Sequence, residues 1–155
     1  MQGQDLEGPA LPGQAARQPI GNWISESGDS WRQEGVIVTT DAAAAQALMA
    51  ELLAVAQACA KDPIPVGDGN SSVSKVSTLK GVGAEAFQVA REIVKADNTS
   101  AGVEGSTLAV GRSGRTIIAM RYGVYFDTPI TKPAEAITDD GLAKDLKKRL
   151  TKALA

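Results

Sequence analysis

The sequence contains no histidine, and this absence excludes several kinds of chemistry at once. Without histidine there is no Ser-His-Asp or Cys-His catalytic arrangement, and the commonest ligand of transition metals is missing. The chain has one cysteine, Cys59. One cysteine cannot form an internal disulfide, a zinc site or an iron–sulfur site by itself. We therefore expect no catalytic residues of these types, no metal and no cofactor.

The net charge and the length of the apolar segments exclude two further classes of partner, nucleic acids and the interior of a bilayer. Sixteen Lys and Arg residues against 18 Asp and Glu residues give a formal net charge of −2. A nucleic-acid partner would require a concentrated basic face, so none is expected. No segment approaches the ~20 consecutive apolar residues that span a bilayer. The most apolar stretch, 41–60, is rich in alanine and is interrupted by Gln46, Glu51 and Gln57. We expect no direct membrane insertion of this segment.

The composition divides the chain into two parts. Residues 1–19 contain Pro9, Pro12, Pro19 and three glycines, which is typical of a flexible linker. Residues 20–155 have the length of a single domain. The first residues have neither the basic start nor the hydrophobic run of a signal peptide. This start indicates a cytoplasmic protein, unless Met1 begins a trimmed mature domain.

Hydrophobic periodicity and turn residues predict the order β-β-α-β-β-β-β-α. Strands joined mainly by short turns indicate an antiparallel sheet. The fold class is therefore α+β, with a curved antiparallel sheet of about five to six strands packed against two amphipathic helices. The expected strands lie near 23–24, 34–40, 73–79, 86–95, 106–112 and 115–126, and the expected helices span 42–59 and 139–153.

Each expected helix has an apolar side. Asp41 is a good N-cap for the first helix, whose core face is predicted to contain Leu48, Leu52, Val55 and Cys59 at spacings of four, three and four. Cys59 is therefore expected to be a buried, inert thiol. The second helix is expected to bury Leu142, Leu146, Leu150 and Ala153 and to expose Lys144, Lys147, Lys148 and Lys152.

Strand 115–126 suggests a ligand cleft. Ile118, Met120, Tyr122 and Val124 alternate with Ile117, Ala119, Arg121 and Gly123, and the bulkier first set is the better candidate for the core. Arg121 then projects from the opposite face, beside Arg91. We predict that Arg91, Arg121, Tyr125 and one of the two tryptophans, for which we choose Trp23, line a ligand-binding cleft. Solvent-facing arginines are the simpler alternative.

Several features in this order resemble the PknH-like extracellular sensor domain of actinobacterial kinases and lipoproteins. They are the strand 34–39 running into Asp41-Ala42-Ala43-Ala44-Ala45-Gln46, the helix ending Gln57-Ala58-Cys59, the turn Gly83-Ala84-Glu85-Ala86, the strands around Ser113-Gly114 and the closing Lys/Leu helix. The resemblance covers residues 20–155. It implies a noncatalytic, extracytoplasmic domain, on the cell surface or secreted, that holds a small molecule or cell-envelope component in a cleft. In that family the cysteine at the position of Cys59 is often paired with another in the sheet, and this chain has no second cysteine.

Two other functions stay open from the residues themselves. A small enzyme or cyclase of natural-product metabolism could work without histidine, using Asp127, Glu135 and Tyr125 for acid–base chemistry. An inhibitor or interaction protein could present the loops 61–72 or 96–105 to a macromolecular partner.

Overall fold

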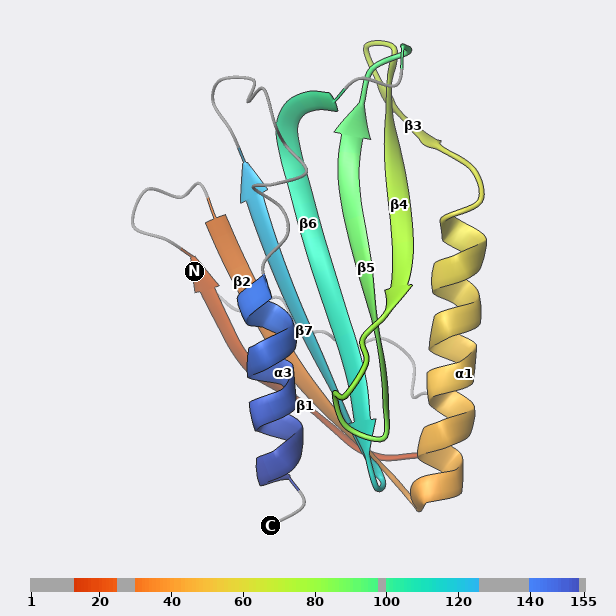
Figure 1. Ribbon diagram of the computed structural model, residues 1–155, viewed down its shortest axis with the longest axis vertical. Coiled ribbons are helices and arrows are strands. Elements are labelled where there is room, and N and C mark those ends of the chain that lie inside the picture. Colours follow the sequence, from red (N-terminus) through yellow and green to blue (C-terminus); the bar gives the residue numbers. More distant parts are fainter. Residues whose placement is uncertain (1–12, 25–29, 98–99, 126–139, 154–155) are drawn as a thin grey trace.

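The computed structural model describes residues 13–24, 30–97, 100–125 and 140–153. Within these ranges the chain forms a seven-stranded sheet in the order β1-β2-β7-β6-β5-β4-β3 with two helices (Figure 1). Every pair of neighbouring strands is antiparallel. The elements are β1 (Gln14–Ile24), β2 (Ser30–Thr39), α1 (Ala42–Cys59), β3 (Ile64–Gly67), β4 (Asn70–Thr78), β5 (Glu85–Val94), β6 (Ser100–Ser113), β7 (Thr116–Tyr125) and α3 (Asp140–Lys152).

The α+β class and the antiparallel sheet are confirmed, but the sheet has more strands than the expected five to six. The additional strand is β3, in a stretch that the sequence predicts to be a loop because it contains Pro63, Pro65 and Gly67. β3 lies at the edge of the sheet, where a proline can be tolerated because no further strand needs its missing N–H group. A tight turn with positive φ at Asp68 and Gly69 then leads into β4.

The first strand begins inside the segment expected to be a linker. β1 starts at Gln14, which pairs with Thr39, so the expected boundary between residues 19 and 20 is wrong. Pro19 lies in this strand, again at a sheet edge, and the pairing register shifts between Pro19 and Gly21. Residues 1–12 of the expected linker lie outside the described residues.

The two helices cover opposite faces of the sheet, because neighbouring residues of β7 pack against different helices. Ile118 and Met120 join the buried cluster with α3, and Ile117 joins the cluster with α1. Ile118 and Met120 are core residues as predicted, but Ile117 is equally buried, at 1% exposure. Both faces of the sheet therefore contribute to the core.

α3 is the better buried of the two helices. Leu142, Leu146 and Leu150 recur every four residues and are 0–1% exposed, as the sequence predicts, whereas Ala153 is exposed. They pack against residues of β5, β6 and β7 that include Ala86, Ala109 and Met120. α3 contacts mainly β6 and β7, which leaves the β1–β2 side of the same face uncovered by this helix.

α1 begins as predicted but buries a different set of residues. Asp41 is the N-cap, and its Oδ1 accepts a hydrogen bond of 2.8 Å from the amide of Ala44. The predicted burial of Val55 and Cys59 is wrong: Val55 is 62% exposed and Cys59 is exposed. The fully buried positions, Ala45, Leu48 and Met49, all lie in the first half of the helix. Leu52, Leu53 and Ala56 pack against the same cluster but are only partly buried, so the sheet covers the start of α1 more completely than its second half.

By length and composition alone, α1 also qualifies as a membrane-spanning helix. Core helices of folded domains pass the same test. Here 17% of the segment is buried, and its buried residues Leu48 and Met49 pack against Phe87, Val110 and Ile117 of the sheet.

Candidate ligand-binding groove

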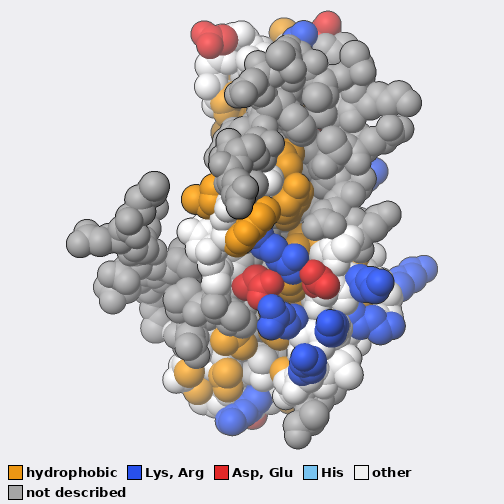
Figure 2. All heavy atoms as spheres, turned by 90° about the vertical axis from the view of Figure 1, so that its left-hand side faces the viewer, with side chains coloured by type: hydrophobic (Ala, Val, Ile, Leu, Met, Phe, Trp, Pro, Cys, Tyr) orange, Lys and Arg blue, Asp and Glu red, His pale blue; other side chains and the backbone are white. Residues whose placement is uncertain are grey.

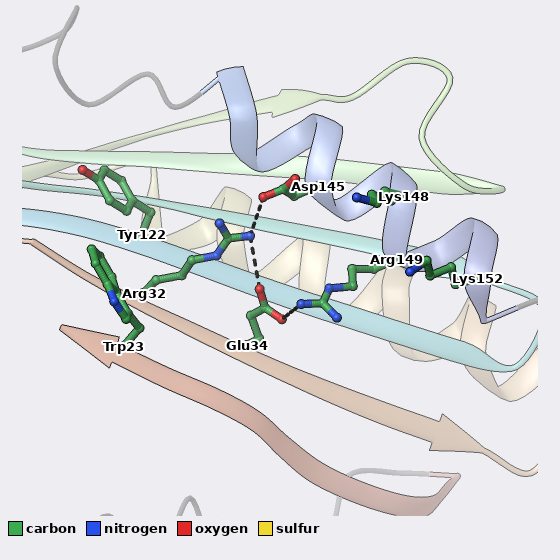
Figure 3. Close-up of a pocket in the computed structure, with 8 residues that line it drawn as sticks. All are labelled: Trp23, Arg32, Glu34, Tyr122, Asp145, Lys148, Arg149 and Lys152. Carbon is green, nitrogen blue, oxygen red and sulfur yellow. Dashed lines mark hydrogen bonds and ion pairs between the residues drawn. The ribbon is translucent and has the colours of Figure 1, made fainter. Parts of the chain in front are cut away.

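A groove with a volume of about 580 Å³ lies beside α3 on the face of the sheet that α3 covers (Figure 3). Its volume is within the range of about 300–1,000 Å³ that is usual for small-molecule sites. It is lined by Trp23, Arg32, Glu34, Tyr122, Asp145, Lys148, Arg149 and Lys152. The floor comes from β1, β2 and β7, and one wall comes from α3.

The register of the sheet places three lining residues in a row across three strands. Trp23 of β1 lies opposite Arg32 of β2, and Arg32 lies opposite Tyr122 of β7. Residues directly opposite in antiparallel strands share a face, so all three side chains lie on the α3 side. Glu34 follows on the same face because side chains alternate along β2. The strand pairing therefore fixes the order of these side chains along the floor of the groove.

An ion-pair network joins the sheet to α3. Arg32 Nη2 lies 3.1 Å from Glu34 Oε1 and 2.9 Å from Asp145 Oδ2. The other oxygen of Glu34, Oε2, lies 3.1 Å from Arg149 Nη2. Glu34 is well shielded, with its side chain 11% exposed, whereas Asp145 is 45% exposed. Glu34 therefore holds one arginine from the sheet and one from the helix.

The network leaves cationic groups unsatisfied. The Nε of Arg32 is buried and has no hydrogen-bond partner. Within the described part of the chain, neither Lys148 nor Lys152 forms an ion pair. Four basic and two acidic residues are among the described residues that line the groove, which gives these residues a charge of 4 − 2 = +2 in a chain whose formal net charge is −2. The groove is therefore a local site of positive charge.

The lining has an aromatic end and a basic end. In Figure 3, Trp23 and Tyr122 flank one end of the Arg32 side chain, and Lys148, Arg149 and Lys152 follow one another along α3 on the other side. The space-filling view shows basic side chains gathered around acidic ones on this face, with apolar side chains above and below them (Figure 2). Trp23 is 55% exposed, so its ring is available for contact.

The structure does not bring the four predicted site residues into one cleft. Arg91 and Arg121 lie on the α1 face, because they continue the alternation of Phe87 in β5 and of Ile117 in β7. Trp23 lies on the opposite face. Tyr125 ends β7, and its side chain lies outside the described part of the structure. Trp23 is therefore the one predicted site residue that the structure places in the groove.

The two predicted arginines have partners on the α1 face. The Nε of Arg91 donates a hydrogen bond of 2.6 Å to Ser72 Oγ. The guanidinium carbon of Arg121 lies 4.7 Å from the ring centroid of Trp31, within the range of a cation–π interaction. The tryptophan beside Arg121 is thus Trp31. Ligand binding by Arg91 and Arg121 stays a prediction.

Several groove residues carry little signal in the sequence. Lys148 and Lys152 are predicted to lie on the exposed side of the last helix, and their spacing of four residues places them on one side of it. Arg32 and Glu34 alternate on one face of β2, but this pattern also fits a solvated edge. The pairing register places Trp23 opposite Arg32, and the packing of α3 on the sheet brings Asp145, Lys148 and Lys152 to the same groove.

The described residues offer binding chemistry. No group of three or more His, Cys, Asp and Glu side chains within the described ranges could hold a metal ion. Glu34 and Asp145 both accept from guanidinium groups, an arrangement that positions cations. A cationic groove with an aromatic end is suited to holding an anionic small molecule.

Comparisons with known proteins show a likeness of fold. No family model matches the chain, and no curated protein matches it. The crystal structure of the extracellular domain of PknH from Mycobacterium tuberculosis is similar, with 14% sequence identity and a TM-score of 0.59. The match covers 90% of this chain and 66% of that one, so this chain spans slightly under two thirds of that structure's length. At this identity the likeness shows the α+β fold and nothing finer.

Proposed function

We propose that this chain is a noncatalytic, extracytoplasmic ligand-binding domain of the sensor type, and that the groove beside α3 holds a small molecule or cell-envelope component. The fold similarity to an extracellular domain supports the class and the location. The observation that carries the proposal is the groove itself, which concentrates a charge of +2 on a chain of net charge −2 and contains a buried, unpartnered Arg32 Nε. Buried polar groups without partners are rare in folded proteins and call for an explanation.

The groove is a better candidate than the α1 face that the sequence favours. There Arg91 is bonded to Ser72 and Arg121 is stacked on Trp31, so both guanidinium groups already have a structural role. In the groove, Lys148 and Lys152 have no ion-pair partner among the described residues. Cations without a partner can bind an anion without first breaking an internal contact.

The enzyme alternative depends on Asp127, Glu135 and Tyr125. The first two lie outside the described residues, as does the side chain of Tyr125, so that alternative stays a prediction. The inhibitor alternative depends on the loops 61–72 and 96–105, and β3 and β4 replace most of the first of these loops. The described residues that line the groove include none of the residues on which these alternatives depend.

The two tryptophans allow a direct test, because Trp23 lies in the groove and Trp31 on the opposite face. The indole N–H signals are followed by ¹⁵N NMR while inorganic phosphate, phenyl phosphate, glucuronic acid and a soluble peptidoglycan fragment are added in turn. We expect at least one compound to shift the Trp23 signal in a saturable way, to leave Trp31 unmoved and to raise the melting temperature. A shift confined to Trp31, or no shift with any compound, contradicts the proposal.

A further inference from the structure

We infer that the groove takes an amphiphilic anion, in which a ring or other flat apolar group is joined to a phosphate, sulfate or carboxylate. This inference rests on the proposed function and adds the chemical class of the ligand. Two features of the groove carry it: the cationic groups along α3 and Arg32, and the aromatic pair at the other end (Figure 3).

Among the described residues, the basic end has more positive charges than negative ones. Lys148 and Lys152 are one helical turn apart, and Arg149 lies between them in the sequence with its Nη2 on Glu34. Glu34 and Asp145 neutralise two of the four positive charges, so the groove retains a charge of 4 − 2 = +2. A phosphate, sulfate or carboxylate would supply oxygens for charge-assisted hydrogen bonds to these cations. An anion is therefore the ligand group that this end is suited to bind.

Arg32 supplies a second, independent indication. Its Nη2 serves both Glu34 and Asp145, while its Nε is buried without an acceptor. Arginine cannot lose its charge, so this N–H group stays a donor in every state of the protein. A ligand oxygen that reaches it, with a small rotation of the side chain, adds a hydrogen bond that the unbound protein lacks.

The aromatic end requires more than an inorganic ion. Trp23 is 55% exposed, and Tyr122 packs partly against the α3 core and lines the groove from the other side of Arg32. Exposed aromatic surface beside charged groups is typical of sites that bind an apolar group and a polar group together. A ring lying against Trp23 would bury this surface, and its charged substituent would then lie beside Arg32.

The inference is tested with three probes that separate the two halves of the ligand. Phenyl phosphate carries both a ring and an anion, inorganic phosphate carries the anion alone, and benzyl alcohol carries the ring alone. The shift of the Trp23 indole signal is measured at increasing concentrations of each, with Trp31 as the internal control. We expect phenyl phosphate to bind at least about tenfold more tightly than either half, a ratio that corresponds to about 1.4 kcal/mol. Its affinity should fall as sodium chloride is raised, because salt screens exposed charges.

Matched variants assign the binding to the groove. The double variant Lys148→Ala/Lys152→Ala removes two charges that line it, and Lys144→Ala/Lys147→Ala removes two from exposed positions of the same helix that do not. We expect the first pair to weaken phenyl phosphate about tenfold or more and the second pair to change it less than about twofold. The affinity of the Trp23→Ala variant for phenyl phosphate, measured by calorimetry, should fall to its affinity for inorganic phosphate.

The outcomes separate this inference from the proposed function. If benzyl alcohol or inorganic phosphate binds as tightly as phenyl phosphate, the ligand class is wrong although the groove still binds. If none of the three probes moves Trp23, the ligand class is again wrong, and the proposed function fails only if the wider panel also leaves Trp23 unmoved. Equal weakening by both lysine pairs would attribute binding to the general charge of α3 and would overturn the inference.

The same chemistry could come from a soluble metabolite or from a lipid headgroup. Cosedimentation with vesicles of phosphatidic acid and phosphatidylcholine distinguishes the two. Binding to these vesicles that Lys148→Ala/Lys152→Ala abolishes and Lys144→Ala/Lys147→Ala preserves identifies a headgroup. Binding of phenyl phosphate without cosedimentation identifies a soluble ligand. Both results support an amphiphilic anion.

Discussion

The indole ring of Trp31 lies directly over Gly123 of the neighbouring strand. The two residues are partners in the β2–β7 register, and a Cβ atom on Gly123 would lie 2.6 Å from Trp31 Nε1 and closer still to two ring carbons. The guanidinium of Arg121, two residues before Gly123 on the same face, stacks on this ring. A glycine is required here because any side chain would displace the tryptophan.

Replacement of Gly123 by alanine should therefore destabilise the protein. We expect Gly123→Ala to lower the free energy of unfolding by about 1–3 kcal/mol, the usual cost of an overpacked site. Urea unfolding of the purified variant measures the change. Gly21→Ala is the matched control, since a Cβ at Gly21 meets nothing within 4 Å and its φ is not positive. That variant should change stability by less than about 1 kcal/mol. Equal losses in both would show that Trp31 does not pack on Gly123 in solution.

Local patterns in the sequence determine most of the elements. The last helix is predicted over 139–153 and observed as Asp140–Lys152, and the last described strand is predicted over 115–126 and observed as Thr116–Tyr125. These segments have a clear period, of about 3.6 residues in the helix and two in the strand, and turn residues bound them. Where a segment's own residues determine its structure, prediction from one sequence succeeds.

The candidate site could not be predicted in the same way, because it depends on which residues of separate elements face one another. The position of Trp23 opposite Arg32 follows from the β1–β2 register, and the approach of Asp145 follows from the packing of α3. Neither is a local property of the chain. The alternation within single strands therefore predicts Trp23 beside Arg91 and Arg121, which lie on the opposite face of the sheet.

Val55 and Cys59 show a second limit. Their spacing from Leu48 is that of a helix core face, but how far such a face is buried depends on how far the sheet extends beneath it. In this fold the fully buried positions of α1 end at Met49. A periodic stripe of apolar residues predicts which side of a helix is buried. It does not predict how much of the helix length is buried.

The unequal burial of the helices predicts unequal effects of truncating their apolar residues. Leu146 of α3 is 0% exposed, whereas Val55 of α1 is 62% exposed. We expect Leu146→Ala to lower the free energy of unfolding by about 2–5 kcal/mol, through lost burial and the cavity left behind. Val55→Ala should stay within about 0.5 kcal/mol, as is usual for surface substitutions. Urea unfolding followed by circular dichroism measures both. A decrease of more than about 2 kcal/mol in the free energy of unfolding of Val55→Ala would show that Val55 is buried in solution.

The exposure of Cys59 predicts that its thiol reacts while the protein is folded. We expect Ellman's reagent to modify one thiol per native molecule. The rate of this reaction should differ by at most about twofold from the rate for the protein unfolded in urea, because exposure governs access to a thiol. The Cys59→Ser variant is the blank for the absorbance change. Protection of the native thiol by tenfold or more would show that Cys59 is covered in solution.

The difference in burial between Glu34 and Asp145 predicts how each contributes to stability and to anion binding. Glu34 is 11% exposed and forms ion pairs with two arginines, so Glu34→Gln should cost about 1–3 kcal/mol, because it leaves the charged groups of a shielded network without their partner. Asp145→Asn is the matched control, since it also removes one carboxylate from the groove, at a position 45% exposed. It should cost about 0–1 kcal/mol, as exposed ion pairs do.

Both substitutions raise the charge of the groove lining from +2 to +3 and should strengthen phenyl phosphate binding, because less of the positive charge is neutralised internally. The gain should be smaller for Glu34→Gln if its two arginines lose their fixed positions. Urea unfolding gives the stabilities, and the Trp23 indole shift gives the affinities. Weaker binding of phenyl phosphate by Asp145→Asn, with its fold intact, would mean that Asp145 positions Arg32 for the ligand and that the net charge of the groove does not set the affinity.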